Sequence, residues 1–440
     1  MFLRLLISGS VATTIALSAR SADADALARL KPDRLAAVHA VVEALAKERQ
    51  EVNRAGQYRD YRANLHVHSA FSHDSRGKIE EIVAAAKAAE TQVLMFTEHP
   101  ADHYDFFRDG HQGVRDGVLL IPGAEMRGFL VYPTLSLKGI DGGSPQDLCD
   151  LVRGKGGHMF VAHLEERMEW SIEGVTGVEI YNTHADFKDE KNLIAAMRNP
   201  LWLFGAADLF RKYPQESLSA LQDYPADYLK RWDELCQIAP HTGVSANDSH
   251  QNVGLVLKLL DGGKVRFEDA LGEKLFELEG QSNPALTPLL KDKQPGETLF
   301  ELRLDPYARS LRHVGTHLLM KELTRDAVWE ALEAGRAYVA FDWIADATGF
   351  DFAASSGTER YEMGSRVPVS ADLKLTAEAP LPVSWRLIRR GEIAAEGTGR
   401  TFEFKPILPG NYRLEAWLDL AGEKQVWILS NPVYVGAEAN

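Results

Sequence analysis

The chain has 440 residues, of which 45% are hydrophobic and 25% are charged, and its formal net charge at pH 7 is −14. This composition is ordinary for a globular protein and excludes a disordered chain, a collagen-like repeat and a polytopic membrane protein. Because an acidic surface repels phosphate backbones, we expect no nucleic-acid partner. The length suits about three domains, or one α/β barrel with a smaller domain.

The first 24 residues predict an export signal. Arg4 supplies a positive charge, an apolar stretch follows, and Ala22-Asp23-Ala24 offers a cleavage site between small residues. The stretch is too short and too polar to span a bilayer well, so we expect no stable membrane anchor; an uncleaved N-terminal anchor is the alternative. We therefore expect an exported protein, and a periplasmic one if the source cell has two membranes.

The next segment, residues 25–60, is expected to contain an N-terminal helix. Its apolar residues Leu35, Val38, Val42 and Leu45 recur at helical spacing. From about residue 61 the pattern changes.

Residues 61–345 begin with short apolar runs that alternate with helical segments, which is typical of βα units around a parallel sheet. The runs expected to form strands are Ala63–Val67, Val93–Phe96, Val118–Ile121, Met159–Ala162, Val178–Tyr181, Leu201–Phe204 and Thr242–Ser245. The helical segments between them include Lys78–Ala89, Gln146–Val152 and Ala226–Ile238. We therefore expect an α/β barrel in this part of the chain.

The pattern of residues 255–345 is less regular, although Arg312–His317 fits a strand and Asp326–Ala334 fits a helix. This segment could cap the barrel or join the domain that follows. From about residue 365, apolar and polar residues alternate between turn residues. We expect residues 346–440 to form a small antiparallel β-sandwich.

The two cysteines, Cys149 and Cys236, do not belong to a CxxC pair. Thiolate zinc sites and CxxC redox motifs are therefore excluded. We expect both side chains to be buried as small hydrophobic groups, and a single disulfide between them is the alternative.

Residues that can bind metals occur at the ends of five predicted strands. They are His66 and His68, Thr97-Glu98-His99, Gly123-Ala124-Glu125, Ala162-His163 and Asn247-Asp248-Ser249-His250. All strand C-termini of a parallel α/β barrel open on one face, so these side chains should converge on one pocket. His66 and His68 are two residues apart on a strand, which points both imidazoles to the same side.

Imidazole and carboxylate ligands without thiolates suit Zn, Mn or Fe. More than four such ligands exceed the needs of one tetrahedral ion, so we expect a carboxylate-bridged cluster. Two ions about 3.5–4 Å apart can activate a shared water and stabilise both the attacking and the leaving oxygen. The pattern therefore predicts hydrolysis by a metal-bridging hydroxide.

The ordered motifs, which begin with His66-Val67-His68-Ser69, resemble those of the PHP (polymerase and histidinol phosphatase) superfamily over roughly residues 61–255. The resemblance implies a distorted (β/α)7 barrel that holds two or three divalent metal ions and hydrolyses phosphoesters. The ligands that it implies are His66, His68, Glu125 and Asp248 for one ion, Glu125 and His163 for a second, and His99 and His250 with an aspartate for a third.

Three departures from the family pattern affect these ligands. Where the family often has Ser-Asp-Gly, this chain has Ser72-His73-Asp74-Ser75, so Asp74 is the expected aspartate and His73 its competitor. Glu98 replaces the commoner aspartate and should leave His99 available. Residues 127–137 contain no histidine, although many members have one there. The second ion could therefore lack a ligand, and the site could hold only two ions.

The C-terminal segments Gly410–Glu415 and Trp427–Val435 look like those of the CehA/McbA branch of PHP-like metallohydrolases. That branch includes carbamate-ester hydrolysis. The expected substrate is therefore a small-molecule ester, with a phosphoester first and a carbamate or carboxyl ester as the alternative.

Several other side chains could contact this substrate. Arg127 and Arg76, and with less support Arg167, could bind an anionic group, although each could equally form a surface ion pair. His184 could act as a general acid for the leaving group, or lie exposed in a loop. His313 and His317 would share one strand face, and we expect no catalytic role for them.

Two other protein classes remain as alternatives. An amidohydrolase barrel also begins with HxH, but Glu125 after the third run and Asp248-Ser249-His250 after the last favour the PHP pattern. A non-catalytic protein could instead hold metal structurally and bind a glycan or a partner through its sandwich. The sequence indicates neither the oligomeric state nor the identity of the metal.

Overall fold

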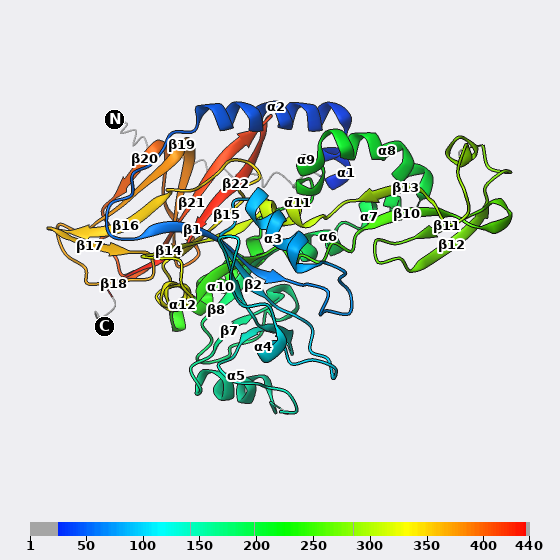
Figure 1. Cartoon of the computed structure of the whole chain (residues 1–440). Helices are drawn as coiled ribbons and strands as arrows, with labels where there is room; N and C mark the ends of the chain where they lie inside the picture. Colours follow the sequence, from blue (N-terminus) through cyan, green and yellow to red (C-terminus); the bar gives the residue numbers. More distant parts are fainter. Residues whose placement is uncertain (1–24, 141, 198, 285, 437–440) are drawn as a thin grey trace, which may run out of the picture.

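The computed structural model describes residues 25–140, 142–197, 199–284 and 286–436, so the predicted export signal, residues 1–24, lies outside them. The fold of the described part is mixed α/β, with strands in three sheets (Figure 1). In this part of the chain, no helix is long and apolar enough to cross a membrane.

The largest sheet has fourteen strands, and most follow the order β17-β16-β19-β21-β22-β15-β14-β1-β2-β4-β3. Their bounds are β1 (Arg59–Val67), β2 (Val93–Phe96), β3 (Gly113–Arg115), β4 (Val118–Ile121), β14 (Gly315–Met320), β15 (Ala337–Ala340), β16 (Asp351–Ser356), β17 (Glu359–Glu362), β18 (Arg366–Val367), β19 (Lys374–Arg389), β20 (Glu392–Phe404), β21 (Gly410–Leu420), β22 (Glu423–Ser430) and β23 (Val433–Val435). β15 pairs with β22, so the sheet continues from the first part of the chain into the C-terminal strands. The separate β-sandwich that we predicted is therefore not confirmed.

A second sheet has the order β5-β6-β7-β8-β9. Its strands are β5 (Ala124–Met126), β6 (Phe129–Tyr132), β7 (His158–Val161), β8 (Gly177–Asn182) and β9 (Thr242–Ala246). Two isolated parallel bridges, Val67–Ser249 and Glu98–Ala124, connect it to the ends of β1 and β2. The described strands do not pair in one closed ring, and the predicted (β/α)7 barrel is therefore not confirmed.

A third sheet forms an arm that projects from the rest of the molecule, at the right of Figure 1. Its antiparallel strands are β10 (Gly254–Leu259), β11 (Lys264–Glu268), β12 (Lys274–Glu279) and β13 (Thr298–Arg303). The arm belongs to the segment 255–345, whose pattern was irregular, whereas β14 and β15 of the same segment lie in the first sheet, next to β1 and β22.

Helix α2, which corresponds to the predicted N-terminal helix, runs along one side of the molecule (Figure 1). The bounds of the helices are α1 (Ala26–Arg29), α2 (Pro32–Glu48), α3 (Ile79–Ala88), α4 (Phe106–Asp109), α5 (Pro145–Arg153), α6 (Thr183–Asp189), α7 (Lys191–Met197), α8 (Pro200–Lys212), α9 (Pro214–Ser219), α10 (Ala226–Ile238), α11 (Tyr307–His313) and α12 (Arg325–Glu333). Proline occupies a first-turn position in α2, α5 and α9, where its missing N–H costs no helical hydrogen bond.

Most predicted strands coincide with observed ones, but two predictions were wrong. Leu201–Phe204 lies within α8. The prediction of a strand failed because a short apolar run fits a helix as well as a strand. The segment 312–317 is divided, since α11 ends at His313 and β14 begins at Gly315. As predicted, both cysteines are buried, and neither forms a disulfide.

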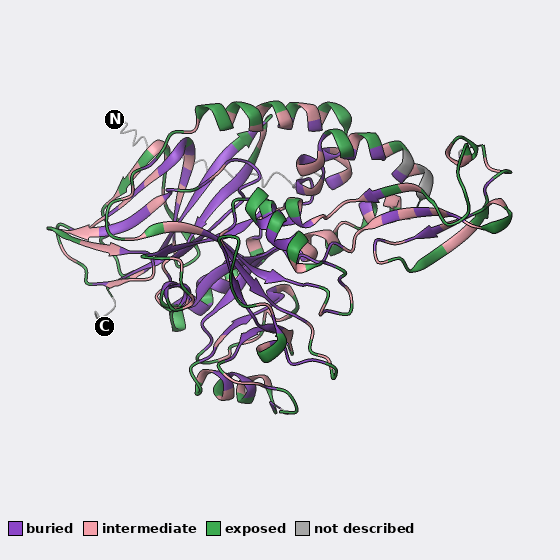
Figure 2. Cartoon of the chain, viewed as in Figure 1, coloured by how far each residue is buried: buried purple, intermediate pink, exposed green. Residues whose placement is uncertain are grey.

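The strands at the centre of the molecule are buried almost throughout, whereas the arm is partly exposed (Figure 2). Trp232, Trp385 and Trp427 are among the largest fully buried side chains. Burying one large apolar side chain stabilises a fold by roughly 1.5–3 kcal/mol. The strands β1, β2, β7 and β9 also contribute buried apolar side chains to one common core cluster, which fixes the strand ends relative to one another.

Candidate metal centre

The structure brings all eight predicted metal ligands together near the bridges between the first two sheets. Six of them lie on or directly after strands, namely His66 and His68 (β1), His99 (β2), His163 (β7), and Asp248 and His250 (β9). Glu125 lies in β5, which follows β4 in the sequence but belongs to the second sheet, and Asp74 lies in the loop between β1 and α3. Residues far apart in the sequence therefore meet because their strands end at the same place.

The first group of ligand atoms comes from His66, His68, Glu125 and Asp248, and these atoms lie within 4.8 Å of one another. His66 Nε2 is 3.1 Å from Asp248 Oδ1 and 3.4 Å from Glu125 Oε2. His68 Nε2 is 3.5 Å from Asp248 Oδ1. This is the set that the PHP resemblance implied for one ion.

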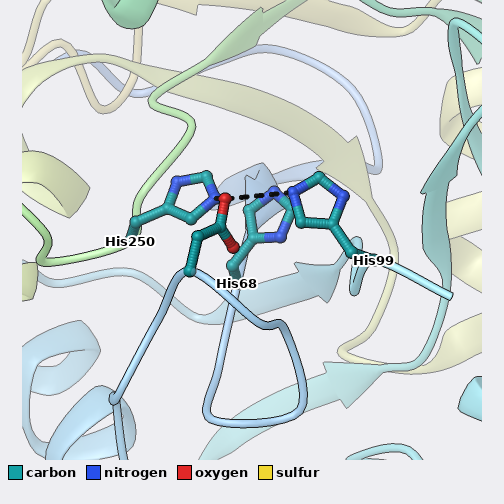
Figure 3. A group of neighbouring side chains, drawn as sticks. His68, His99 and His250 are labelled. Atoms are coloured by element: carbon teal, nitrogen blue, oxygen red, sulfur yellow. Dashed lines mark ion pairs between the residues drawn. The ribbon is translucent and has the colours of Figure 1, made fainter. Parts of the chain in front are cut away.

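The second group contains His68, Asp74, His99 and His250. Figure 3 shows its three histidines converging on one point. Asp74 Oδ2 lies 3.3 Å from both His99 Nε2 and His250 Nε2. The competitor His73 has a side chain that is 79% exposed, and its Nδ1 is 4.0 Å from Asp74 Oδ1. The geometry therefore places Asp74, and not His73, among the potential ligands.

His163 lies beside the first group. Its Nε2 is 3.1 Å from Glu125 Oε1 and 3.6 Å from Asp248 Oδ2. Among the described residues, no third group of three or more ligand atoms forms around it. This agrees with the missing histidine after Glu125, which led us to consider a site with only two ions.

The tautomers of the histidines suit metal binding. His66 Nδ1 donates to Glu179 Oε1 at 2.7 Å, and His250 Nδ1 donates to the carbonyl oxygen of Asp248 at 2.9 Å. His68 Nδ1 donates to Ser72 Oγ at 3.0 Å, because the Ser72 hydroxyl itself donates to Glu98. Each bond places the proton on Nδ1, which leaves the lone pair of Nε2 free to bind a cation.

Several buried atoms at the centre make no hydrogen bond. They are Nε2 of His66, His68 and His250, Oδ1 of Asp74 and Oδ1 of Asp248. An unsatisfied buried polar atom costs about 1–3 kcal/mol, so natural proteins rarely keep several of them together without a partner. Divalent cations would satisfy these atoms, and imidazole with carboxylate is a ligand set that Zn, Mn and Fe accept. The residues present therefore fit the metal ions that the sequence predicts.

The charges of the cluster are strongly coupled. Burial raises the pKa values of Glu125 and Asp248, but the nearby histidines, His66 above all, lower both by more, so both carboxylates stay ionised. Burial and the neighbouring His250 lower the pKa of His68 to about 3. For His163, burial lowers the pKa, but hydrogen bonds to Glu125 and Glu165 raise it by more, to about 10. A bound cation would therefore displace protons from this site.

Two potential ligands sit on strained backbone. His163 has φ 46° and Asp248 has φ 52°, in the left-handed region that non-glycine residues seldom adopt. Such strain costs about 1–3 kcal/mol per residue and clusters at functional sites. The backbone N–H of His163 donates to Glu179 Oε2 at 2.8 Å, which helps to hold this turn.

Glu179 is a functional residue that the sequence analysis missed. Its carboxylate is fully buried in β8 and accepts hydrogen bonds from His66 Nδ1, from the backbone of His163 and from Asn182 Nδ2. It therefore orients two histidines of the cluster. A glutamate between the apolar residues of a predicted strand was the available signal, because a buried charge needs partners.

Glu98 has a more specific role than leaving His99 available. Its carboxylate accepts hydrogen bonds from the Ser72 hydroxyl (2.7 Å) and from the backbone and hydroxyl of Ser69. Ser72 Oγ in turn accepts from His68 Nδ1 and from the backbone N–H of His99. Glu98 thus positions two potential ligands through one serine.

The predicted substrate-binding arginines lie outside the cluster. Arg127 is exposed and donates to the carbonyl oxygen of Gly143, and Arg76 is exposed and donates to the carbonyl oxygens of His73 and Ser75. Arg167 donates to the carbonyl oxygens of Ala162 and His163, at 3.1 Å each. In the described contacts these guanidinium groups fix loops and do not reach the ligand atoms.

His184, predicted as a general acid, lies at the edge of the cluster. Its Nδ1 donates to Asp248 Oδ2 at 3.0 Å, and its side chain is 41% exposed. By contrast, His313 is the last residue of α11 and contacts Tyr181 and Ser219, so it does not share a strand face with His317. His184 is therefore placed both to contact the cluster and to meet a ligand.

The PHP domain model matches residues 64–229 of this chain. The search of curated proteins found no match to this chain. A solved structure from Bacteroides vulgatus, described as a two-domain protein containing a predicted PHP-like metal-dependent phosphoesterase, is 15% identical. The similarity covers 87% of this chain and 99% of that one, with a TM-score of 0.35, which is too low to establish a common fold.

Proposed function

We propose that this protein is a metal-dependent hydrolase that cleaves an ester bond in a small molecule, with a phosphoester as the first candidate. The observation that carries the proposal is the cluster itself. Two groups of ligand atoms share His68, and five buried atoms of the cluster make no hydrogen bond. The match of residues 64–229 to the PHP domain supports the same reaction class.

One divalent ion would be held by His66, His68, Glu125 and Asp248. A second would be held by Asp74, His99 and His250, with His68 at the edge of this group. His163 with Glu125 would contribute to a third where three ions bind. When bound, Zn, Mn or Fe ions supply Lewis-acid activation of water and stabilisation of negative charge at the reacting centre. The chain itself contributes the fixed orientation of its imidazoles through Glu179, Ser72 and Glu98.

His184 is the candidate proton donor. Asp248 Oδ2 can only accept, so the hydrogen bond between them places a proton on Nδ1 of His184. The second ring nitrogen is then available to a ligand at the half-exposed edge of the cluster. Protonation of His184 by solvent would allow this nitrogen to protonate a leaving-group oxygen.

A carbamate or carboxyl ester is the second candidate substrate. Arg76, Arg127 and Arg167 all donate to backbone carbonyl oxygens in loops, so the described arginines near the site are not arranged as a phosphate clamp. The C-terminal segments that look like the CehA/McbA branch, where carbamate esters are hydrolysed, favour the same alternative. We also propose that the chain belongs to that branch and that its first two sheets together form a distorted PHP-type barrel.

The test is a set of initial rates for protein without residues 1–24, loaded with Zn or Mn. Chromogenic phosphomonoesters and phosphodiesters would be compared with a carbamate and a carboxyl ester, and the His68→Ala variant would serve as the blank. Phosphate-selective turnover that the variant lacks would establish a phosphoesterase, and carbamate- or ester-selective turnover would establish the second candidate. Equal rates for both proteins would refute a reaction at this site.

The proposal includes export, because residues 1–24 have the composition of a signal peptide. Expression with and without these residues, followed by fractionation of a two-membrane bacterium, would test it. We expect the full chain in the periplasmic fraction and the truncated chain in the cytoplasm. A non-catalytic metal protein would be indicated if the metal-loaded chain hydrolysed no ester class but bound a glycan or another polymer.

A further inference from the structure

A cavity of about 240 Å³ adjoins the metal centre, and Asp248 and His184 form part of its wall. The rest of the wall comes from helices α6 to α9 and α11, from the loops after β9 and β13, and from Leu30 after α1. Because Asp248 belongs to the ligand cluster and also lines the cavity beside His184, a molecule bound at the cluster can extend past His184 into this space. The cavity was not visible in the sequence, since its wall comes from segments more than a hundred residues apart.

The wall of the cavity is mainly apolar. Its apolar side chains include Phe187, Leu193, Met197, Phe210, Leu218 and Leu221. Besides Asp248 and His184, the charged residues that line it are Asp305 and Arg309. Asp305 accepts hydrogen bonds from the backbone of Asn252 and Val253, and Arg309 donates to the carbonyl oxygens of Arg303 and Leu304. The side chains of Asp305 and Arg309 are thus engaged in hydrogen bonds that hold the surrounding loops.

Two hydroxyl groups in the wall have no partner. Ser217 Oγ and Ser249 Oγ are buried and make no hydrogen bond, although buried hydroxyls in proteins are normally satisfied. Ser249 follows the ligand Asp248, and Ser217 lies in α9. A neutral polar atom of a bound molecule, such as an ester or ether oxygen, would satisfy either of them.

We infer that this cavity binds an uncharged, apolar alkyl or aryl group of the substrate, so that the natural substrate is an ester carrying such a group. The inference rests on the proposed function, because the cluster must bind the ester head group. It adds the substrate class, which neither the ligand residues nor the PHP match specifies. Sugar phosphates carry a hydroxyl group on nearly every carbon, and burying these groups against the apolar wall without hydrogen-bond partners would be unfavourable.

Binding of product-like ligands tests the cavity without requiring turnover. Metal-loaded protein would be titrated in a calorimeter with n-alkylphosphonates and n-alkylcarboxylates that carry alkyl groups of one, three and five carbons. Burial of one methylene is worth about a fourfold gain in affinity, so we expect a gain on the order of 100-fold from the shortest to the longest chain in at least one series. Equal affinity across both series, or no binding in either, would overturn the inference.

Leu218→Trp should fill the cavity and reduce this gain to less than about tenfold. Leu209→Trp is the matched control, because Leu209 is also half-buried on a neighbouring helix but does not line the cavity. Met197→Trp, from α7, is a second filling variant in case the first does not fold. An undiminished gain in both folded filling variants would also overturn the inference.

The two proposals fail in different ways. Ester hydrolysis without any dependence on chain length would refute the apolar cavity and leave the hydrolase intact. Chain-length dependence of binding without hydrolysis of any ester would refute the hydrolase and leave the cavity as a ligand site.

Discussion

Strand β1 carries a buried cluster of histidine and carboxylate at each of its ends, and the two clusters differ in how their imidazole nitrogens are paired. At the start of β1, both ring nitrogens of His317 donate to carboxylates, Nδ1 to Asp60 at 2.8 Å and Nε2 to Asp342 at 3.0 Å. At the end of β1, Nε2 of His66 and of His68 makes no hydrogen bond.

This difference separates a structural ion pair from a metal site. An imidazole with both nitrogens bonded to carboxylates is a cation that neutralises them, and it has no lone pair for a metal. An imidazole with only Nδ1 bonded keeps a lone pair on Nε2 and gains its missing partner from a cation. Both clusters combine histidine with carboxylates, so the pairing of individual atoms distinguishes them, together with Arg62, which contacts Asp342 at the start of β1.

The largest effect should come from breaking the ion pairs at the start of β1. His317→Ala leaves the buried Asp60 without its hydrogen-bonded cation, whereas Asp342 keeps Arg62 Nε at 3.0 Å, and we expect it to lower the free energy of unfolding by about 3–5 kcal/mol. Urea denaturation of the metal-loaded protein measures this loss. The exposed His103 provides the control His103→Ala, which should change the free energy of unfolding by less than about 0.5 kcal/mol. A loss below 1 kcal/mol in His317→Ala would contradict the structural role.

A change at the other end of β1 should instead affect activity. Asp74→Asn removes the charge of a potential ligand, and we expect the hydrolysis rate to fall on the order of 100-fold, as for the loss of a charge-stabilising group. His73→Ala is the matched control, because this neighbouring side chain is exposed and should leave the rate within about threefold. Initial rates and metal content of both variants show which of the two side chains is required for activity and metal binding. The opposite ranking would make His73 the ligand.

The hydrogen bonds behind the ligands should have a smaller effect. Glu179→Gln weakens the hold on His66 Nδ1 and on the backbone of His163, and losing such a partner typically costs 10–100-fold in metal affinity. Competition with a chromogenic chelator measures this affinity. Glu169→Gln, at an exposed position, should show no change. If both variants bound metal equally, Glu179 would not position the ligands.

The smallest expected effect is a dependence of stability on pH. Burial lowers the pKa of His317, but Asp60 and Asp342 raise it by more, to about 9, above the value of about 6.5 for an unfolded chain. The stabilisation by its positive charge is complete below pH 6.5 and is lost as the pH rises to about 9. The free energy of unfolding should therefore fall over this range more steeply in the native protein than in His317→Leu. Parallel curves from denaturation at pH 6, 7.5 and 9 would contradict this.

The sequence predicted much of the candidate site because strand ends can be recognised locally. His66, His68, His99, His163, Asp248 and His250 each follow an apolar run, and parallel strands bring such positions together. Asp74 lies in a loop whose path no periodicity describes, so it was expected through the family resemblance, and the structure places it beside His99 and His250. Glu179 was missed because its partners, His66 and His163, are distant in the sequence.

The arrangement of the sheets was less predictable. Apolar runs such as Val93–Phe96 and Val118–Ile121 indicated strands, but Leu201–Phe204 had the same appearance and is helical. Alternation near the C-terminus indicated antiparallel strands, yet it did not show that β22 pairs with β15 and extends the first sheet. Which strands pair depends on which strand edges come together, and distant strands come together only when the chain folds.

The sequence by itself determined the chemistry available to this protein, because the residue types at its strand ends are those that bind divalent metals. It also determined the acidic charge and most strand positions, which depend on local composition and periodicity. Only the tertiary structure decided which atoms remain unpaired, why His317 is a structural cation while His68 is a potential ligand, and where an apolar cavity adjoins Asp248. These properties depend on distances between segments that are remote in the sequence. A hydrogen bond or a cavity wall between such segments forms only when folding brings them together.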